Sequence, residues 1–366
     1  MKVLIITHSL RYNYGGILQN FALQQVLKKL GHSCVTLKLR RKTSRLDSLL
    51  EFLKYLLRRL LKGRANRPLS DDDLNIICSQ TDSFINRNIQ MSPAMGLIDK
   101  RWISRQYFNA IVVGSDQVLH PASYKKIEDI YLSFIKGVKK VIYAGSFGPE
   151  KWNYTKRQTE KCAELVRDFS GISVREKSGK AFFQQYFNAE AELVLDPTLL
   201  LDQSEYLSLI DKPIKKSGLV TYLLDPSSAK NDIVQFVGSS LQLNIQRAGN
   251  EGMDNPSLTP SERVADRVED WLSRMAGADF IITDSFHGTC FAIIFRKSFI
   301  AVGNEHRGLD RFRTLLSHFG LEDRLVFGMN EVNISNLIST PIQYDIISNI
   351  QEQKIKKSVD FLFNSL

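Results

Sequence analysis

The 366-residue sequence contains few cysteines and no long apolar run. Its four cysteines, Cys34, Cys78, Cys162 and Cys290, are far apart and form no C-x-x-C pair, which fits reduced thiols in the cytosol and gives no support to a zinc site. No apolar stretch approaches the length of a transmembrane helix, and the apolar run that follows Met1 is too short for the core of a signal peptide. We therefore expect a cytoplasmic protein without a metal site.

The sequence also lacks a G-x-G-x-x-G dinucleotide fingerprint, internal repeats and low-complexity segments. Its hydrophobic content of 43% and charged content of 24% are those of an ordinary globular protein and exclude a disordered one. A chain of this length exceeds the size at which one core usually splits, so we expect two domains.

The net charge of +10 is concentrated in one segment. Residues 38–67 contain eleven Lys or Arg and two acids, so the rest of the chain is close to neutral. Leucines recur there at helical spacing and predict an amphipathic helix, which either packs on the first domain with a solvated basic back or rests on an anionic membrane surface. A nucleic-acid-binding arm is disfavoured, because only Phe52 and Tyr55 are available for base stacking. The leucines are Leu46, Leu49, Leu50, Leu53, Leu57, Leu60 and Leu61.

Strand and helix signals alternate along the chain. Short apolar runs predict strands at 2–7, 34–39, 110–113, 141–144, 172–174, 193–195, 219–224, 243–246, 280–283 and 299–302. Helices are expected at 17–30, 71–88, 177–187, 230–240, 264–275, 289–295 and 346–366. Two successive βα series predict two Rossmann-like, doubly wound α/β domains that face a cleft. We place the N-terminal domain at 1–170, the C-terminal domain at 171–345, and at 346–366 a helix that packs back on the first domain.

Polar and small residues follow the predicted strands of the first domain, where ligands of doubly wound folds bind. After the first strand, a glycine pair allows a tight turn and the close approach of a ligand, although the plain alternative is a turn. Three compact polar groups follow the strand at 110–113, and an aromatic residue follows the strand at 141–144. The candidates are Asn13, Tyr14, Gly15, Gly16, Gln19, Ser115, Asp116, Gln117 and Phe147.

In the second domain, the segment from Thr283 to Thr289 carries the strongest signal. An apolar strand runs into His287 at the start of an apolar helix, whose N-terminus attracts anions and favours a neutral imidazole. Cys290 lies one helical turn further on, and its apolar neighbours favour a core position over a nucleophile.

Three arginines complete the set of candidates. Arg307 and Arg311 can converge on one anion if a helix begins near Leu309, and the alternative is a solvated basic turn. Arg175 follows another predicted strand, where a surface ion pair is the simpler interpretation.

These strings, taken in order, resemble the polysaccharide pyruvyltransferase family. The resemblance rests on Tyr-Gly-Gly (14–16), Gly-Ser-Asp-Gln (114–117), Ser-Phe-Gly (146–148), Arg-Glu-Lys-Ser (175–178), Asp-Pro (196–197) and Thr-Asp-Ser-Phe-His-Gly (283–288). It implies a GT-B-like fold, phosphoenolpyruvate as the donor, no further cofactor, and a sugar acceptor whose two hydroxyls become a cyclic pyruvate ketal. It also implies a lipid-linked precursor of a capsule or exopolysaccharide as the acceptor, at the inner face of the membrane.

The resemblance lets roles be assigned to the candidates. Phosphoenolpyruvate carries a phosphate and a carboxylate, so its binding is assigned to Arg175, Arg307 and Arg311, together with Ser285 and Gly288. His287 is assigned proton transfer and Asp116 the orientation or deprotonation of the acceptor hydroxyl. The remaining candidates of the first domain are assigned to the acceptor.

One departure from the family and one alternative function stay open. Where the family commonly has an aromatic residue after Gly-Ser-Asp-Gln-Val, this chain has Leu119 and then His120, which points to altered acceptor specificity. The alternative is a GT-B nucleotide-sugar glycosyltransferase, which needs a late acidic residue for the nucleotide, and Glu305 is the obvious candidate.

Overall fold

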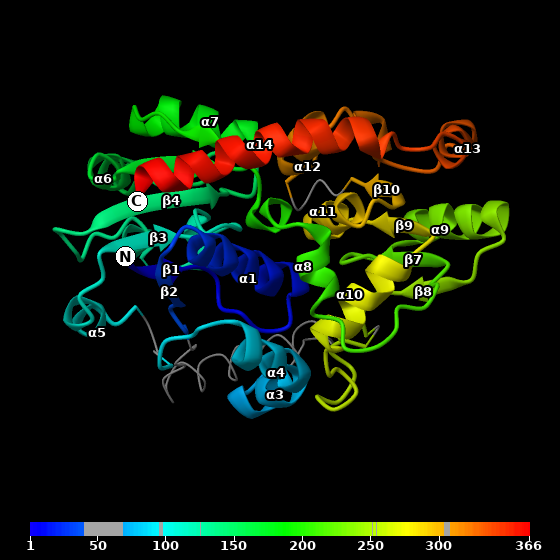
Figure 1. The fold of residues 1–366 in the computed structure, drawn as a ribbon, viewed down its shortest axis with the longest axis horizontal. Helices are drawn as coiled ribbons and strands as arrows, with labels where there is room; N and C mark the ends of the chain where they lie inside the picture. Colours follow the sequence, from blue (N-terminus) through cyan, green and yellow to red (C-terminus); the bar gives the residue numbers. More distant parts are fainter. Residues whose placement is uncertain (40–68, 95–97, 125, 251, 254, 304–307) are drawn as a thin grey trace, which may run out of the picture.

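The structure, a computed structural model, describes residues 1–39, 69–94, 98–124, 126–250, 252–253, 255–303 and 308–366. These residues form two parallel β-sheets that lie side by side with helices packed around them (Figure 1). The prediction of two doubly wound α/β units is confirmed. We call the six-stranded sheet with its helices the first unit, and the five-stranded sheet with its helices the second unit.

The first sheet has the strand order β2-β1-β3-β4-β5-β6, and all its pairs are parallel. β1 is central, and Ile6 at its carboxyl end lies opposite Val113 of β3. Successive residues of β1 contribute to cores on opposite faces of the sheet, which explains its uninterrupted apolar sequence. The strands are β1 (Lys2–Ile6), β2 (Ser33–Thr36), β3 (Ala110–Val113), β4 (Lys139–Gly145), β5 (Gly171–Val174) and β6 (Glu192–Leu193).

The domain boundary placed near residue 170 is wrong. β5 pairs with β4, and β6 pairs with β5, so both strands belong to the first sheet rather than to the second domain. The chain therefore passes to the second unit only after β6. The apolar pattern located these two strands, but it carries no information on which sheet they join.

The second sheet has the order β11-β10-β9-β7-β8 and is also entirely parallel. β9 is central and runs directly into α11. The strands are β7 (Leu219–Tyr222), β8 (Ile245–Arg247), β9 (Phe280–Thr283), β10 (Ser298–Val302) and β11 (Leu325–Val326).

Helices connect the strands in both units. Those of the first unit are α1 (Tyr14–Lys29), α3 (Asp71–Ile77), α4 (Ser79–Asn88), α5 (Lys100–Arg105), α6 (Lys156–Val166) and α7 (Lys177–Phe182). The short helix η4 (Pro197–Leu200) lies in the connection between the sheets. The later helices are α8 (Gln203–Leu207), α9 (Ser228–Leu241), α10 (Val268–Gly277), α11 (Phe286–Ile294), α12 (Asp310–Ser317), α13 (Glu331–Ser339) and α14 (Tyr344–Ser365).

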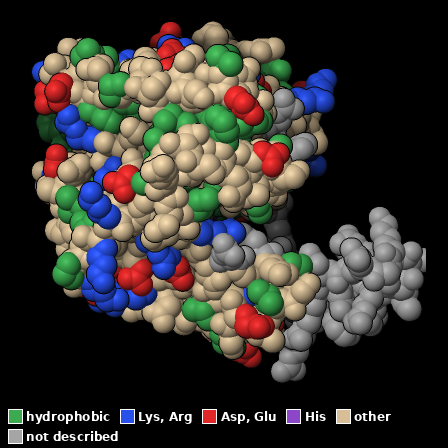
Figure 2. All heavy atoms as spheres, turned by 90° about the vertical axis from the view of Figure 1, so that its right-hand side faces the viewer, with side chains coloured by type: hydrophobic (Ala, Val, Ile, Leu, Met, Phe, Trp, Pro, Cys, Tyr) green, Lys and Arg blue, Asp and Glu red, His purple; other side chains and the backbone are tan. Residues whose placement is uncertain are grey.

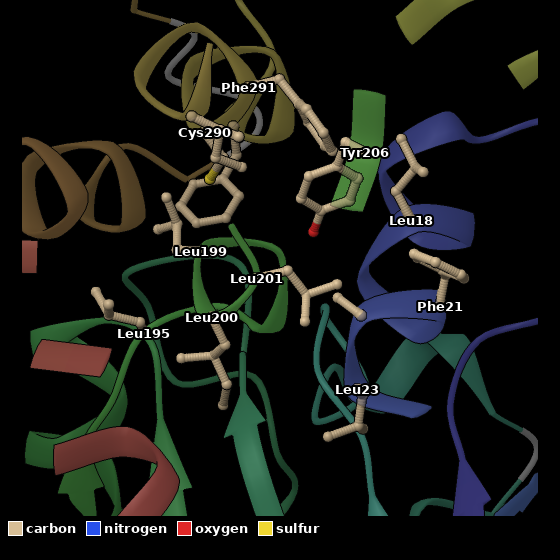
Figure 3. Close-up of a cluster of buried hydrophobic side chains, with 14 of the residues drawn as sticks. Leu18, Phe21, Leu23, Leu195, Leu199, Leu200, Leu201, Tyr206, Cys290 and Phe291 are labelled. Carbon is tan, nitrogen blue, oxygen red and sulfur yellow. The ribbon is translucent and has the colours of Figure 1, made fainter. Parts of the chain in front are cut away.

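One continuous hydrophobic core joins the two units. It extends from β1 and α1, through η4 and α8, to α11 and β9. Figure 3 shows this junction: Leu18 and Phe21 of α1 face Tyr206 of α8, and Phe291 of α11 lies beyond it. Because α1 packs against both units, 13 of its 16 residues are buried.

The helix α14 links the second unit back to the first (Figure 1). Near its start, the hydroxyl of Tyr344 donates to the carbonyl oxygens of Ala292 and Lys297 in the second unit. Near its end, Phe361 packs against Tyr143 of the first sheet. The predicted helix at 346–366 therefore begins two residues earlier and packs on the first unit, as well as touching the second.

Two expectations from the sequence concern the surface: that the chain outside 38–67 is close to neutral, and that no helix crosses a membrane. On the face shown in Figure 2, basic and acidic side chains are interspersed, and neither sign dominates. Among the described residues, no helix is long and apolar enough to cross a bilayer. The basic segment predicted at 38–67 lies almost wholly outside the described residues, so its two interpretations stay open.

Candidate active site

A cavity of about 370 Å³ lies between the two units, beyond the carboxyl ends of their strands. Its volume suits a small ligand with several polar groups. From the first unit it is lined by His8, Asn13, Asp116, Gln117, His120 and Pro149, and from the second by Leu224, Ser285, Phe286, His287 and Arg311. The cavity thus collects predicted site residues from sequence positions almost 300 apart.

A wider groove of about 1080 Å³ runs between α7, β6 and α14. Lysines on α7 and α14 lie beside acidic residues on its wall, and Lys357 is 3.8 Å from Glu192. Of the predicted site residues that the structure describes, none lines this groove. We therefore place the site in the smaller cavity, where the polar strand ends meet.

His287 lies in the first turn of α11. β9 ends at Thr283, and Ser285 caps the helix by accepting a hydrogen bond from the N–H of Gly288 at 3.3 Å. The free N–H groups of this first turn favour a negative charge nearby. The His287 side chain is 8% exposed and reaches the cavity wall.

The glycine at position 15 makes room for this imidazole. A Cβ atom on Gly15 would lie 2.2 Å from His287 Nδ1, closer than any non-bonded contact allows. The predicted loop of Gly15 and Gly16 is in fact the first turn of α1, which Asn13 caps by accepting from the N–H of Gly16. The close approach expected for a ligand is made by a side chain of the second unit.

Asp116 lies three residues after the end of β3 and has a left-handed backbone conformation with φ 77°. Such strain in a non-glycine residue is concentrated at functional sites. Its carbonyl oxygen accepts hydrogen bonds from the N–H groups of Val118 at 2.7 Å and Ser146 at 3.0 Å, which hold this conformation. The carboxylate lies at the cavity wall.

The charge of Asp116 is fixed by its neighbours. Burial alone would raise the pKa of its carboxyl, but Arg175 and then His287 outweigh burial and hold that pKa well below its usual range. The group is therefore ionised at neutral pH and is a weak base. It is better suited to orienting a hydroxyl by accepting a hydrogen bond than to removing its proton.

Arg175 was assigned to donor binding, which requires a guanidinium exposed to the cavity. Its guanidinium is instead buried between two carboxylates. Its side chain is 1% exposed, and its guanidinium donates to Asp196 from Nη1 at 2.7 Å and to Asp116 from Nη2 at 3.0 Å. One face of the guanidinium lies 4.4 Å from the centre of the Phe286 ring. Arg175 does not line the cavity, so the structure favours a role in positioning the two carboxylates over direct contact with a donor.

Glu176, the next residue, is a buried carboxyl group whose pKa is shifted in the opposite direction to that of Asp116. Burial raises its pKa from 4.5 to about 7, and Arg175 only partly offsets this. Its Oε1 accepts a hydrogen bond from the N–H of Phe147 at 3.0 Å. Glu176 has no assigned role of its own from the sequence, because nothing in the sequence shows that it is enclosed.

Two aromatic residues assigned to the acceptor are structural. The hydroxyl of Tyr14 donates to the carbonyl oxygen of Asp266, and its ring stacks on Trp271 at 5.5 Å. Phe147 belongs to an aromatic cluster that includes Phe182, at 5.5 Å. Both side chains are buried and neither lines the cavity, so these two assignments are corrected.

Three smaller assigned residues also lie behind the cavity wall. Gln19 donates from Nε2 to the carbonyl oxygen of Gly16 at 3.0 Å, and Ser115 donates from Oγ to Asp196 at 2.9 Å. A Cβ atom on Gly288 would lie 2.3 Å from Thr283 Oγ1, so this glycine permits tight packing of α11 on β9. Their roles are in holding the loops rather than in touching a ligand.

Of the predicted arginines, Arg311 lies at the cavity and Arg307 lies outside the described residues. Arg311 is in the first turn of α12, its side chain lines the cavity, and its guanidinium carbon is 5.8 Å from the centre of the Phe286 ring. Cys290 is fully buried, and burial raises its pKa, which supports the core position over a nucleophile.

Two histidines extend the site in the first unit. His8 lines the cavity, and its ring stacks on that of Tyr124 at 5.6 Å, with Nδ1 and the Tyr124 hydroxyl 3.2 Å apart. Burial, and then the proximity of His8, lower the pKa of His120, which lines the same wall. His120 was singled out from the sequence, but His8 was not, although its place directly after the first strand was a usable signal.

Asp284 fixes the part of the cavity wall that belongs to the second unit. Its buried carboxylate accepts hydrogen bonds from the N–H groups of Leu224 at 2.6 Å and Asp225 at 3.0 Å, and from the ammonium of Lys230 at 2.6 Å. This holds the loop after β7 against the start of α11, with Leu224 at the cavity.

Two parallel-sheet units with a polar cavity between their strand ends define the GT-B class of fold. Among solved structures, the UDP-GlcNAc 2-epimerase from Neisseria meningitidis bound to UDP-GlcNAc is similar in fold, with a TM-score of 0.51 at 11% identity over 99% of each chain. A UDP-GlcNAc 2-epimerase from Methanocaldococcus jannaschii (TM-score 0.47, 10% identity, 94% of this chain and 93% of that one) and a spinosyn rhamnosyltransferase (TM-score 0.43, 10% identity, 99% and 98%) are also similar.

The family is identified by sequence. The family model described as polysaccharide pyruvyl transferase matches residues 13–306, and the chain belongs to this family. The resemblance stated from the motifs is thereby confirmed. The search of curated proteins gave no match.

Proposed function

We propose that this transferase moves the pyruvyl group of phosphoenolpyruvate onto two hydroxyls of one sugar, forming a cyclic ketal. The observation that carries the proposal is the division of the cavity between the two units. The wall from the second unit holds a cation, Arg311, beside the N-terminus of α11, which suits an anionic donor. The wall from the first unit holds Asp116, Gln117 and His120, which suit the hydroxyls of a sugar.

The proposed reaction balances without a further cofactor. A proton adds to C3 of the enol, which makes C2 electrophilic, and a sugar hydroxyl then bonds to C2 and releases its proton. The bond from C2 to the phosphate oxygen breaks, a second hydroxyl bonds to C2, and its proton is released. One of the two released protons replaces the proton taken up at C3, and the other leaves with hydrogen phosphate.

Three described residues of the cavity have assigned parts in this proposal: His287, Asp116 and Arg311. His287 exchanges protons with C3 or with a hydroxyl, because it lines the cavity and an imidazole can both accept and donate a proton. Asp116, kept ionised by Arg175, accepts a hydrogen bond from the attacking hydroxyl and orients it. Arg311 and the α11 N-terminus hold the phosphate and carboxylate, and Arg307 remains a proposed second cation.

The direct test is a turnover assay. The full chain is incubated with phosphoenolpyruvate and a panel of free, model and lipid-linked glycosides, and both phosphate release and ketal formation are followed, the latter by mass spectrometry. We expect acceptor-dependent phosphate release that matches the ketal formed. Release without an acceptor, or no release with any acceptor of the panel, counts against the proposal.

A pair of variants on α12 tests the donor wall. Arg311→Gln removes a cation that lines the cavity, whereas Arg313→Gln removes an exposed arginine of the same helix that faces Glu150 at 3.6 Å. Calorimetry should show weaker binding of phosphoenolpyruvate by Arg311→Gln, with Arg313→Gln close to the wild type. Equal affinities for the two variants would remove Arg311 from the donor site.

The alternative is a nucleotide-sugar glycosyltransferase, which would use the same fold and cleft. Glu305, its candidate nucleotide-binding residue, lies outside the described residues. A ligand that binds only the folded state raises the melting temperature by mass action, by an amount equivalent to about 2.7 kcal/mol at 100 times its Kd. Stabilisation by UDP-sugars and not by phosphoenolpyruvate would favour the alternative.

The acceptor and its location complete the proposal. We propose a lipid-linked precursor of a capsule or exopolysaccharide as the acceptor, used in the cytoplasm at the inner face of the membrane. Sedimentation with vesicles tests this: binding should require anionic lipid, weaken with salt, and fall when Arg58, Arg59 and Lys62 are replaced by Glu. Equal recovery in the supernatant with and without anionic vesicles would leave only the packed-helix interpretation of 38–67.

A further inference from the structure

Asp196 carries a buried carboxylate that is fixed in orientation from several sides. It lies just before η4, and its side chain is 0% exposed. Oδ1 accepts hydrogen bonds from the N–H of Thr198 at 3.1 Å and from its hydroxyl at 2.8 Å. Oδ2 accepts from Arg175 Nη1 at 2.7 Å and from Ser115 Oγ at 2.9 Å. Four donors thus leave the carboxylate little freedom to rotate.

Oδ2 of Asp196 also faces the imidazole of His287. Nε2 of His287 lies 3.6 Å from Asp196 Oδ2, slightly beyond hydrogen-bonding distance but within the range of an ion pair. This nitrogen is buried, and among the described residues it has no hydrogen-bond partner. A buried polar atom without a partner is costly, and catalytic hydrogen bonds that are long without substrate often shorten when substrate binds.

The two ring nitrogens of His287 therefore face different surroundings. Nε2 points to a fixed carboxylate, while Nδ1 lies beside the backbone of Gly15 in the first turn of α1. A carboxylate accepts but cannot donate, so the nitrogen that faces it carries the ring proton.

We propose that Asp196 is a positioning residue that holds the Nε2 proton of His287 and thereby leaves Nδ1 to exchange a proton with the substrate. The part of this proposal that concerns the substrate rests on the proposed function, but the Asp196–His287 pair does not. Among the described residues, Arg175 bridges Asp196 at 2.7 Å and Asp116 at 3.0 Å, so one guanidinium offsets part of the charge of both carboxylates, and Asp116 also interacts with His287.

Asp196 is suited to this role because it keeps its charge. Burial would raise the pKa of its carboxyl, but His287 and Arg175 outweigh burial and lower it well below the usual range. A carboxylate that stays ionised 3.6 Å from Nε2 can accept the proton of that nitrogen as a hydrogen bond when the two groups move closer.

Nuclear magnetic resonance tests the pair without any assumption about the reaction. In the ¹⁵N-labelled full chain, which has six histidines, the ring signals of His287 are assigned by their loss in His287→Gln. We expect the proton of the neutral ring on Nε2 in the wild type, and a shift of the tautomer toward Nδ1–H in Asp196→Asn, whose amide can donate to Nε2. A wild-type proton on Nδ1 overturns the proposal, even if Asp196→Asn does not fold.

Kinetics test whether the pair acts in turnover. Asp196→Asn should lower kcat by on the order of 10²-fold or more, with a smaller change in the KM for phosphoenolpyruvate, and should alter the pH profile of kcat. The double variant with His287→Gln should be no slower than His287→Gln alone, because the two residues act as one unit. Additive losses, or a pH profile like that of the wild type, overturn the proposal.

A matched control separates this role from the general loss of a buried charge. Glu269 is also a buried carboxylate, paired with Arg87 and Arg267 outside the cavity. Glu269→Gln should lower stability but leave the His287 tautomer and the pH profile unchanged. If phosphoenolpyruvate is never turned over but the tautomer depends on Asp196, the proposed function fails while the pair stands. If phosphoenolpyruvate is turned over but the tautomer does not depend on Asp196, the pair fails while the proposed function stands.

Discussion

His287 lies where three structural features meet: the first turn of α11, the fixed carboxylate of Asp196 and the backbone of Gly15. We expect His287→Gln to fold normally, because glutamine occupies a similar volume, and to lower turnover by on the order of 10²- to 10⁴-fold. Steady-state kinetics with phosphoenolpyruvate, combined with a thermal melt, measure both effects.

A second histidine provides the control for that variant. His318 is half-buried at the end of α12 and does not line the cavity, so His318→Gln should retain near wild-type turnover. If the two variants turn over at similar rates, His287 has no part in proton transfer.

Glu176 gives a prediction about the pH dependence of stability. Its pKa is about 7 in the folded protein and about 4.5 when unfolded, so between these values the folded state binds more protons. Wild-type stability should therefore fall as pH rises through this window, by on the order of 3 kcal/mol from this group. Glu176→Gln removes the titration, so its stability relative to the wild type should increase from pH 5 to pH 7 and then level off.

Denaturant unfolding at several pH values measures this difference. Glu160, an exposed residue of α6, serves as the control, since Glu160→Gln should shift stability little and without a trend in that window. A difference between Glu176→Gln and the wild type that stays constant from pH 5 to pH 8 would show that Glu176 is ionised in the folded protein.

Residue types at strand ends could be predicted from the sequence, but their pairing could not. Asp116, Ser285, His287 and Arg311 were singled out because they follow strands, and the structure brings all four to one cavity. Arg175 was assigned to the donor for the same reason, yet it pairs with two carboxylates, one of them 21 residues away. Such pairing depends on the packing of loops, which no local pattern encodes.

At the scale of elements, the first turn of α1 packs directly against His287 of the second unit. Gly15→Ala places a methyl group within 2.2 Å of His287 Nδ1, so the imidazole or the helix must move. We expect a loss of stability of about 1–3 kcal/mol and a fall in turnover on the order of 10²-fold from the displaced ring. Turnover and denaturant unfolding of the same preparation measure the two effects.

The neighbouring glycine offers a matched control in the same turn. A Cβ atom on Gly16 would lie 3.6 Å from the Asn13 side chain, which is an ordinary contact. Gly16, although assigned to the acceptor from the sequence, does not line the cavity, so Gly16→Ala should fold and turn over much like the wild type. If both alanine variants behave alike, steric contact with His287 is not the reason that Gly15 is needed.

Strands could be placed from the sequence because buried parallel strands are uninterrupted apolar runs. β9 (Phe280–Thr283) was predicted with its bounds, and β4 was located but predicted shorter than it is. The sheet that β5 and β6 join was predicted wrongly, since pairing is a long-range property. The helices α1 and α11 begin three residues earlier than expected, because Asn13 and Ser285 cap them before their apolar faces begin.

For the whole molecule, the continuous core predicts cooperative unfolding. α1, η4 and α11 share one hydrophobic cluster, so the unfolding of either unit exposes apolar surface of the other. Trp152 lies in the aromatic cluster of the first unit and Trp271 in that of the second. The chain has three tryptophans, so two variants are needed in which Trp152 or Trp271 is the single one left and Trp102 is replaced in both. Their fluorescence transitions should occur at the same denaturant concentration and coincide with the loss of helical circular dichroism. Two separate transitions would show that the units unfold independently.

The packing of α1 against both sheets also affects how such a protein can diversify. In a modular enzyme, a second unit can be exchanged between relatives to recombine donor and acceptor preferences. Here Gly15 of α1 accommodates the imidazole of α11, and Tyr14 stacks on Trp271, so the surface that receives the second unit is encoded near the start of the chain. A chimaera that exchanges only the C-terminal half would pair mismatched surfaces. New acceptor preferences are therefore expected to arise by substitution at wall residues such as His8 and His120, and not by exchange of units.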